Sequence, residues 1–269
     1  MIGFVDRVGR RAVGVVDHVG DLSLLLRATL VWMWRACKPG PRRARLGYAA
    51  VVAQTVRVGV ASIFIVSLVS GAIGFILAFQ MAPPLDELGQ VELIPNIISV
   101  AVVRELGPLI AAIVLTGFAG ASIAAEIGTM AVNEEIEALQ ATALNPVRFL
   151  VVPRLLAAVV SLLCLAVLAN FVALLAAAVA GKLALGIPWV TFYNGVLVQI
   201  GPVDFVTGLV KAGIFGMLIG LIACGNGIRV TGGAEGVGNA TTATVVQSIV
   251  AIVMADLLFT ILFYALGLF

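Results

Sequence analysis

The chain has few charged residues, one histidine and three cysteines. Charged side chains make up 11% of its 269 residues and apolar ones 62%, a composition far outside the range of soluble globular domains. Because His18 is the only histidine, one chain cannot build a metal site from several imidazoles. Cys37, Cys164 and Cys224 show no C-x-x-C spacing. We therefore interpret them as small packing residues rather than metal ligands or disulfide partners.

The sequence also lacks a nucleotide-binding loop and any recognisable hydrolytic motif. It contains no G-x-x-x-x-G-K-[ST] pattern, and the glycine-rich run at 232–238 has no lysine and follows no predicted strand. We expect that run to be a flexible cytoplasmic turn. Neither a nucleophile elbow nor a Cys/His pair is present. The sequence thus predicts a protein that is not an enzyme and has no cofactor of its own. If ATP drives it, a partner ATPase must bind the ATP and Mg²⁺.

Long apolar runs dominate what is present. A helix needs about 20 apolar residues to cross ~30 Å of hydrocarbon, whereas membrane β-strands are shorter and alternate in polarity. The sequence predicts an all-α polytopic membrane protein with five transmembrane helices, at residues 58–82, 93–118, 149–180, 203–225 and 245–269. We expect 58–269 to form the transmembrane domain and 1–57 to form a separate N-terminal segment.

The distribution of basic residues predicts the orientation in the membrane. Ten of the sixteen Lys and Arg residues fall at or before Arg57, which places the N-terminus in the cytoplasm. With five spans the C-terminus then faces outward. The loops at 83–92 and 181–202 are predicted to be external, and those at 119–148 and 226–244 cytoplasmic. We expect a multi-pass membrane protein with its N-terminus in the cytoplasm and its C-terminus outside.

The N-terminal segment shows an amphipathic pattern. Apolar residues recur at helical spacing, and polar residues lie on another face of the same helix. The apolar residues are Leu22, Leu25, Leu26, Leu30, Met33 and Cys37. This pattern predicts an interfacial helix. A signal peptide is the alternative, but charged residues interrupt the upstream region and no cleavage site follows an apolar core. The basic run at 39–45 would contact anionic lipid head groups; nucleic-acid binding is its other use, but the run is short and adjoins the membrane.

Four ionisable residues lie inside predicted spans: Arg104, Glu105, Lys211 and Asp256. Each would cost about 2.5–3.5 kcal/mol at a lipid-facing helix centre, so we expect all four to converge inside the bundle. They could be buried ion pairs that only fix the helix register, or they could line a substrate path. We favour the second, in which the two cations meet an anionic head group, the two carboxylates balance them when the site is empty, and the apolar walls accept acyl chains.

Small residues predict where helices approach each other closely. They repeat along the fourth span at Gly208, Ala212, Gly216 and Gly220, and more briefly along the first span around Gly71 and Gly74. Such stripes serve packing within one subunit or the seam of a homodimer, and the sequence does not separate the two. We also expect Gly107 and Pro108 to break the second span directly after Arg104 and Glu105.

A short acidic helix is predicted between the second and third spans, at about 133–142. Asn133 is a suitable N-cap, acidic residues suit the first turn, and Pro146 would end the helix. One face is apolar through Ile136 and Leu139. Anionic lipids would repel its glutamates, so we expect the helix to bind a groove on another protein rather than the membrane surface.

Together these segments resemble the MlaE/YrbE permease family over about residues 50–269. The resemblance rests on the order of the motifs REL-GP at 104–108, AGAS at 119–122, AEIGTM at 125–130, EEIEAL at 134–139, NP at 145–146 and VPR at 152–154, with GGAEGVG at 232–238 and Asp256 near the end. It implies a permease subunit of an ABC transporter that moves phospholipids or related lipids between the inner membrane and the outer envelope. Its partners would be a second permease copy, two ATPase subunits on the cytoplasmic side and a ring of MCE-domain (MlaD-like) proteins outside.

The resemblance also assigns roles to residues. The family's charged cavity residues map onto Arg104, Glu105, Lys211 and Asp256, and its ATPase-coupling helix maps onto 133–142, including Asn133, Glu134, Glu135, Ile136, Glu137 and Leu139. The chain departs from the family where many members carry charged side chains, at Phe118, Ala131, Asn145, Asn239 and Ala243. These departures remove charge from the cytoplasmic face.

Two other functions compete with that of a lipid permease. An ion-coupled secondary transporter could use Glu105 and Asp256 as proton relays, but the chain shows no matching halves with broken helices. A membrane scaffold could tether proteins on both sides, but it would not need buried charges. Nucleic acid is not an expected partner.

Overall fold

The computed structural model describes residues 17, 20–34 and 48–267, and every regular element within them is helical. Five helical stretches are long and apolar enough to cross a membrane: Ala49–Glu87, Val91–Val132, Val147–Leu185, Pro202–Ile228 and Gly233–Ala265. The prediction of an all-α protein with five membrane-spanning helices is therefore confirmed, and the chain is a multi-pass membrane protein.

The first span is longer than predicted at both ends. It consists of α2 (Tyr48–Thr55), a π-helical segment η2 (Val56–Val60) and α3 (Ala61–Glu87). The helix thus runs through Pro83 and Pro84, which we expected to begin an external loop. Each proline removes one backbone donor, and the helix tolerates this near its end. The chain then turns through η3 (Val91–Leu93) into the second span.

The second span contains two π-helical segments and no break. Its order is α4 (Ile94–Ala101), η4 (Val102–Leu106), α5 (Gly107–Leu115), η5 (Thr116–Gly120) and α6 (Ala121–Val132). The predicted interruption at Gly107 and Pro108 is wrong. The N–H of Gly107 bonds the carbonyl of Val102 five residues back, and this wider turn lets the helix pass a proline that has no N–H of its own.

The remaining spans leave less loop than predicted. The third span is η6 (Val147–Val151) followed by α8 (Val152–Leu185), and α9 (Trp189–Gln199) occupies half of the expected loop at 181–202. The fourth and fifth spans are α10 (Pro202–Ile228) and α11 (Gly233–Ala265). The loop predicted at 226–244 is wrong because four residues separate these helices. The glycines at 233–238 are not a flexible turn but the first turns of α11.

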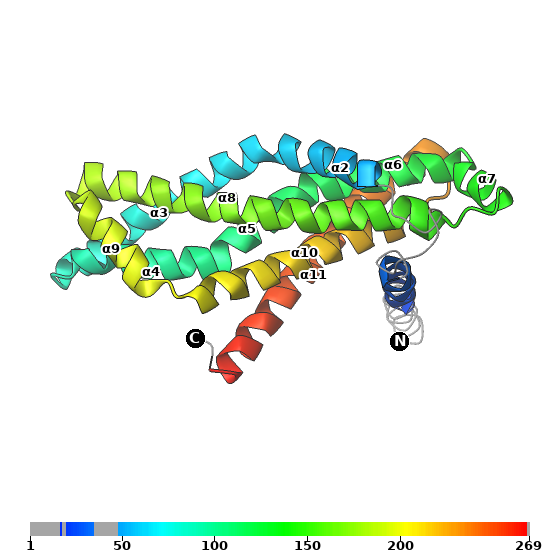
Figure 1. Cartoon of the computed structure of the whole chain (residues 1–269). Coiled ribbons are helices and arrows are strands. Elements are labelled where there is room, and N and C mark those ends of the chain that lie inside the picture. Colours follow the sequence, from blue (N-terminus) through cyan, green and yellow to red (C-terminus); the bar gives the residue numbers. More distant parts are fainter. Residues whose placement is uncertain (1–16, 18–19, 35–47, 268–269) are drawn as a thin grey trace, which may run out of the picture.

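Helix α8 lies at the centre of the bundle and packs against both α3 and α10. The C-terminal end of α11 projects from the bundle (Figure 1). Only Thr244, Ser248, Ile252 and Phe263 of this helix are buried within the single chain.

The small-residue stripes serve packing within the subunit. A Cβ added at Gly216 would approach Val159 Cα of α8 to 2.8 Å, and one at Gly220 would approach Leu155 Cα to 3.1 Å. Gly208 faces the carbonyl oxygen of Val103, and Gly74 faces the backbone of Ala173. These glycines permit close contact between helices of one chain, so the intrasubunit interpretation is confirmed for them.

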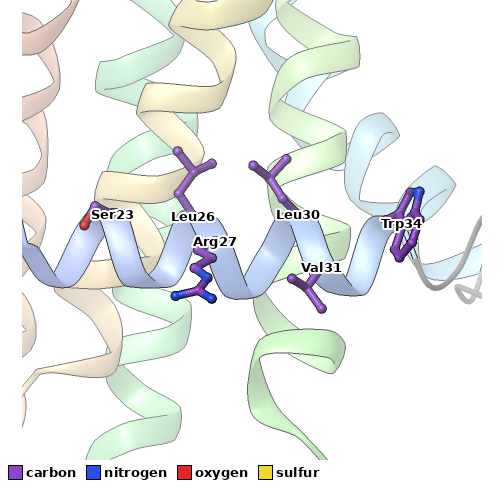
Figure 2. A pocket seen from close by; sticks show the side chains of 6 residues that line it. All are labelled: Ser23, Leu26, Arg27, Leu30, Val31 and Trp34. Atoms are coloured by element: carbon purple, nitrogen blue, oxygen red, sulfur yellow. The ribbon is translucent and has the colours of Figure 1, made fainter.

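The N-terminal helix at residues 20–34 crosses the ends of the long helices (Figures 1 and 2). It is held by an ion pair between Asp21 and Arg229 and by the guanidinium of Arg148 over the ring of Trp32, while Thr29 is fully buried. A hollow of about 390 Å³ lies along this helix, and Figure 2 shows the side chains that line it, those of Ser23, Leu26, Arg27, Leu30, Val31 and Trp34. Cys37 and the basic run at 39–45 lie outside the described residues.

Candidate functional site

Lys211 is the centre of a charged cluster that joins three spans. Its side chain is 0% exposed, and its Nζ donates to Glu105 Oε2 of η4 at 2.6 Å and to Asp256 Oδ1 of α11 at 3.0 Å. A third hydrogen bond of 3.0 Å runs to Thr260 Oγ1. An ammonium group has three donors, so the cluster uses all of them.

Thr260 completes the cluster and was missed by sequence reasoning. Its hydroxyl lies 3.0 Å from Glu105 Oε1 and 2.9 Å from the carbonyl oxygen of Asp256. Thr260 therefore connects the same groups that Lys211 holds. The available signal was its position one helical turn after Asp256, which puts both side chains on one face of α11.

Arg104 does not join this cluster, which corrects the expectation that four charges converge. It pairs instead with Asp204 at the start of α10, with Nη2 at 2.6 Å and Nε at 2.7 Å from Oδ1. The other oxygen of Asp204 accepts the N–H of Gly201 at 2.8 Å and caps the helix. Asp204 was missed because it looks like an ordinary capping residue at a helix start.

The two adjacent residues of η4 thus bind two points of the same neighbouring helix. Asp204 and Lys211 are seven residues apart on α10, which corresponds to about 10 Å along the axis. Arg104 and Glu105 therefore reach in different directions along that helix. Counting two cations and three carboxylates, the five residues carry a formal charge of −1.

The charged residues differ in how accessible they are to a ligand. Lys211 is fully enclosed, whereas the side chains of Glu105 and Arg104 are 30% and 21% exposed. A ligand that entered here would therefore meet Arg104 and Glu105 before Lys211. An ion pair buried this way can simply fix helix positions, but the two partly exposed members leave a charged surface within the second span.

An apolar hollow lies along the same span. It has a volume of about 520 Å³, and its lining residues are Leu93, Asn96, Ile97, Val100, Ala101 and Gln199. Ile97, Val100 and Ala101 lie in α4, the segment directly before the π-helical turn that carries Arg104. A space of this kind can take hydrocarbon.

The acidic helix exists but is shorter than predicted. Helix α7 (Glu135–Ala141) has Glu134 as its N-cap residue with φ of 59°, while Asn133 belongs to the end of α6, where its N–H bonds Thr129. The predicted N-cap is therefore wrong, since α6 extends to Val132 and uses Asn133 as its own last turn. Pro146 does not end the helix either, because the chain already leaves it at Thr142.

Helix α7 is attached to the spans by its apolar residues. Ile136 is buried in a cluster with Ile123, Leu150 and Cys224, and Leu139 packs against that cluster. The carboxylates of Glu134, Glu135 and Glu137 are exposed. The helix thus presents an acidic surface at the end of the bundle (Figure 1).

Comparison with known proteins identifies the class. A chain of five apolar spans with a charged cluster between them is a membrane protein of the transporter type. The family model for Permease MlaE matches residues 51–262, and the chain belongs to the MlaE permease family.

Relatives of this chain span bacteria and a plant. A probable ABC transporter permease protein of Rickettsia bellii is 30% identical over 98% of this chain and 99% of its own length. The intermembrane phospholipid transport system permease protein MlaE of Haemophilus influenzae is 26% identical over 99% of this chain and 100% of its own. The chloroplastic protein TRIGALACTOSYLDIACYLGLYCEROL 1 of Arabidopsis thaliana is 31% identical over 82% of this chain and 63% of its own.

Proposed function

We propose that the chain is the permease subunit of an ABC transporter that moves phospholipids or related lipids between the bacterial inner membrane and the outer envelope. Its N-terminus and α7 would face the cytoplasm and its C-terminus would face outward. ATP and Mg²⁺ would be held by an ATPase subunit, an MCE-domain protein would bind on the outer side, and a second permease copy would complete the core. Family membership and the names of the relatives support this proposal.

The observation that carries it is the placement of Lys211 between Glu105 and Asp256. These residues come from three different spans, so a change in their pairing has to move the spans relative to each other. Helix α11 carries Asp256 and otherwise stands partly away from the bundle. An anionic lipid head group that attracts Arg104 or Lys211 would compete with the carboxylates and weaken the hold on α11.

Helix α7 would receive the motion of the ATPase. Its buried Ile136 joins it to the second, third and fourth spans through one apolar cluster, while its three exposed glutamates form a charged surface for a basic groove on a partner. A displacement of α7 would thus be transmitted directly to the spans that carry Glu105 and Lys211.

The test is to express the chain with its neighbouring ATPase and MCE-domain subunits, purify the assembly, and measure ATP-dependent lipid movement in proteoliposomes. Charge reversal of Glu134, Glu135 and Glu137 to Lys should release the ATPase from the purified assembly. Reversal of Asp86, Glu87 and Glu92 at the opposite end of the spans is the matched control and should leave the ATPase bound. Glu105→Gln should lower lipid movement while the assembly stays intact.

Two results would contradict the proposal. Retention of the ATPase by the triple α7 variant would remove the assignment of α7 as its docking helix. Lipid or ion movement that needs a proton gradient but no ATP would instead support an ion-coupled transporter that uses Glu105 and Asp256.

A further inference from the structure

A second charged group lies apart from the Lys211 cluster, at the end of the spans where α7 is found. It consists of Arg57 in η2, Glu126 in α6 and Arg154 in α8. Both guanidiniums approach the same carboxylate oxygen: Arg57 Nη1 lies 3.3 Å and Arg154 Nη2 lies 3.0 Å from Glu126 Oε1. Two cations and one carboxylate give the group a formal charge of +1.

The hydrogen bonding of this group is incomplete. Arg154 is 8% exposed and donates from Nη1 to the carbonyl of Leu150 at 3.0 Å, but its buried Nε has no hydrogen-bond partner. The second oxygen of Glu126, Oε2, is also buried without a partner. Buried polar atoms are normally paired, so the unpaired Nε donor beside an excess positive charge points to an anionic ligand. The unpaired oxygen of Glu126 can only accept a hydrogen bond and takes no part in binding an anion.

Arg57 opens this group to the surroundings of the protein, since its side chain is 60% exposed. Along the same helix Val60, Phe64 and Leu68 follow at intervals of four residues and are 58%, 74% and 61% exposed. Residues at this spacing lie on one face. The surface therefore begins with a cation and continues as an apolar stripe.

The length of this stripe matches one leaflet of a bilayer. Eleven residues separate Arg57 from Leu68, which corresponds to about 16 Å of helix, and half of a hydrocarbon core of ~30 Å is about 15 Å. A molecule that fits the whole surface carries an anionic group at one end and a hydrocarbon chain of about one leaflet in length. Guanidinium groups are well suited to phosphate because they offer paired donors in one plane.

We propose that Arg57 and Arg154, which Glu126 holds together, bind the phosphate group of a membrane phospholipid whose acyl chain lies along Val60, Phe64 and Leu68. Arg57 supplies free donors at the exposed side, and Arg154 supplies the unpaired Nε behind it. The site is separate from the cluster of Glu105, Lys211 and Asp256, and it does not depend on whether the chain works with an ATPase. It places a specifically held lipid at the α7 end of the first span.

A site-specific crosslink tests the proposal. The full-length chain with Phe64→p-benzoylphenylalanine would be purified, mixed with dioleoyl phosphatidic acid or with dioleoylglycerol, and irradiated, and the crosslinked lipid would be quantified by mass spectrometry. Phosphatidic acid should crosslink about tenfold more than dioleoylglycerol, since hydrogen bonds to charged groups are strong enough for that ratio. Arg57→Gln should remove most of this preference. Because Arg57 is exposed and its pairing is at the surface, this variant is expected to fold.

Two controls keep the result specific. Lys182→Gln removes a cation at the opposite end of the spans and should leave the preference at position 64 unchanged. A probe at the exposed Phe171 of α8 should show no dependence on Arg57. The crosslink measures lipid binding without ATP or a partner protein. Its result therefore does not depend on whether the chain proves to be a lipid transporter.

Three outcomes would overturn the proposal. Equal crosslinking of both lipids at position 64 would show ordinary bilayer contact without head-group recognition. An unchanged preference in Arg57→Gln would show that the arginine does not bind the phosphate. Binding of inorganic phosphate that phosphatidic acid does not displace would show that the site takes free phosphate and not a lipid.

Discussion

Lys211 and Glu105 lie 106 residues apart in the chain, yet Lys211 Nζ and Glu105 Oε2 are 2.6 Å apart in the structure. The ammonium is fully enclosed and shared with Asp256, so the contact connects η4, α10 and α11 at one point. The stability of the bundle and the position of α11 are therefore coupled to a single side chain.

Replacing Lys211 should be more damaging than replacing either carboxylate. Lys211→Met leaves Glu105 and Asp256 close to each other with no cation between them, and breaking a buried pair in this way typically costs about 3–5 kcal/mol. Glu105→Gln keeps an acceptor for Lys211 and should cost less. Thermal unfolding of the purified variants in detergent would show which substitution lowers the melting temperature more.

The exposed Lys182 provides the control for this comparison, because Lys182→Met removes the same group where nothing is buried. A melting temperature for Lys211→Met equal to that of Lys182→Met would contradict the role of Lys211 as the centre of the cluster.

Asp204 pairs with Arg104 and also caps α10, and two different substitutions distinguish these roles. Asp204→Asn keeps an oxygen for the N–H of Gly201 but removes the charge that pairs with Arg104, whereas Asp204→Ala removes both. We expect Asp204→Asn to lower the free energy of unfolding by about 1–3 kcal/mol and Asp204→Ala by about 1 kcal/mol more through loss of the cap. Thermal unfolding of both variants measures the difference.

A double-mutant cycle with Arg104→Gln then isolates the ion pair. The loss of stability in the double variant should be smaller than the sum of the two single losses, because the second substitution finds the ion pair already broken. Strict additivity would argue that Arg104 and Asp204 do not interact.

Gly208 and Gly213 lie on the same helix and should respond oppositely to alanine. A Cβ at Gly208 would collide with the carbonyl oxygen of Val103, whereas one at Gly213 would have its nearest neighbour, Leu163 Cδ2, at 3.8 Å. Gly208→Ala forces α10 away from η4 and should lower the free energy of unfolding by about 1–3 kcal/mol. Each kcal/mol lost should lower the melting temperature by about 2–4 °C. Gly213→Ala should be neutral or slightly stabilising, because alanine favours the helix. Equal melting temperatures for the two variants would show that α10 does not approach η4 this closely.

The amino-acid sequence determined the fold class and the number of spans, because long apolar runs can be stable in hydrocarbon only as helices whose backbone groups are paired internally. It also identified Glu105, Lys211 and Asp256, because an ionisable residue in such a run is costly unless it finds a partner. The ends of the helices were less predictable. Pro83, Pro108 and the glycines at 233–238 predict breaks by local rules, but π-helical turns and packing against neighbouring helices kept the helices continuous.

Only the tertiary structure decided which charges meet. Arg104 and Glu105 are neighbours in sequence, and no local rule separates their partners; the crossing of η4 over α10 assigns Arg104 to Asp204 and Glu105 to Lys211. The same holds for Arg57, Glu126 and Arg154, which come from three spans and carry no pattern that joins them. Hydropathy acts along one helix at a time, whereas ion pairing depends on distances between helices, and those distances are set by the small residues at which the helices touch.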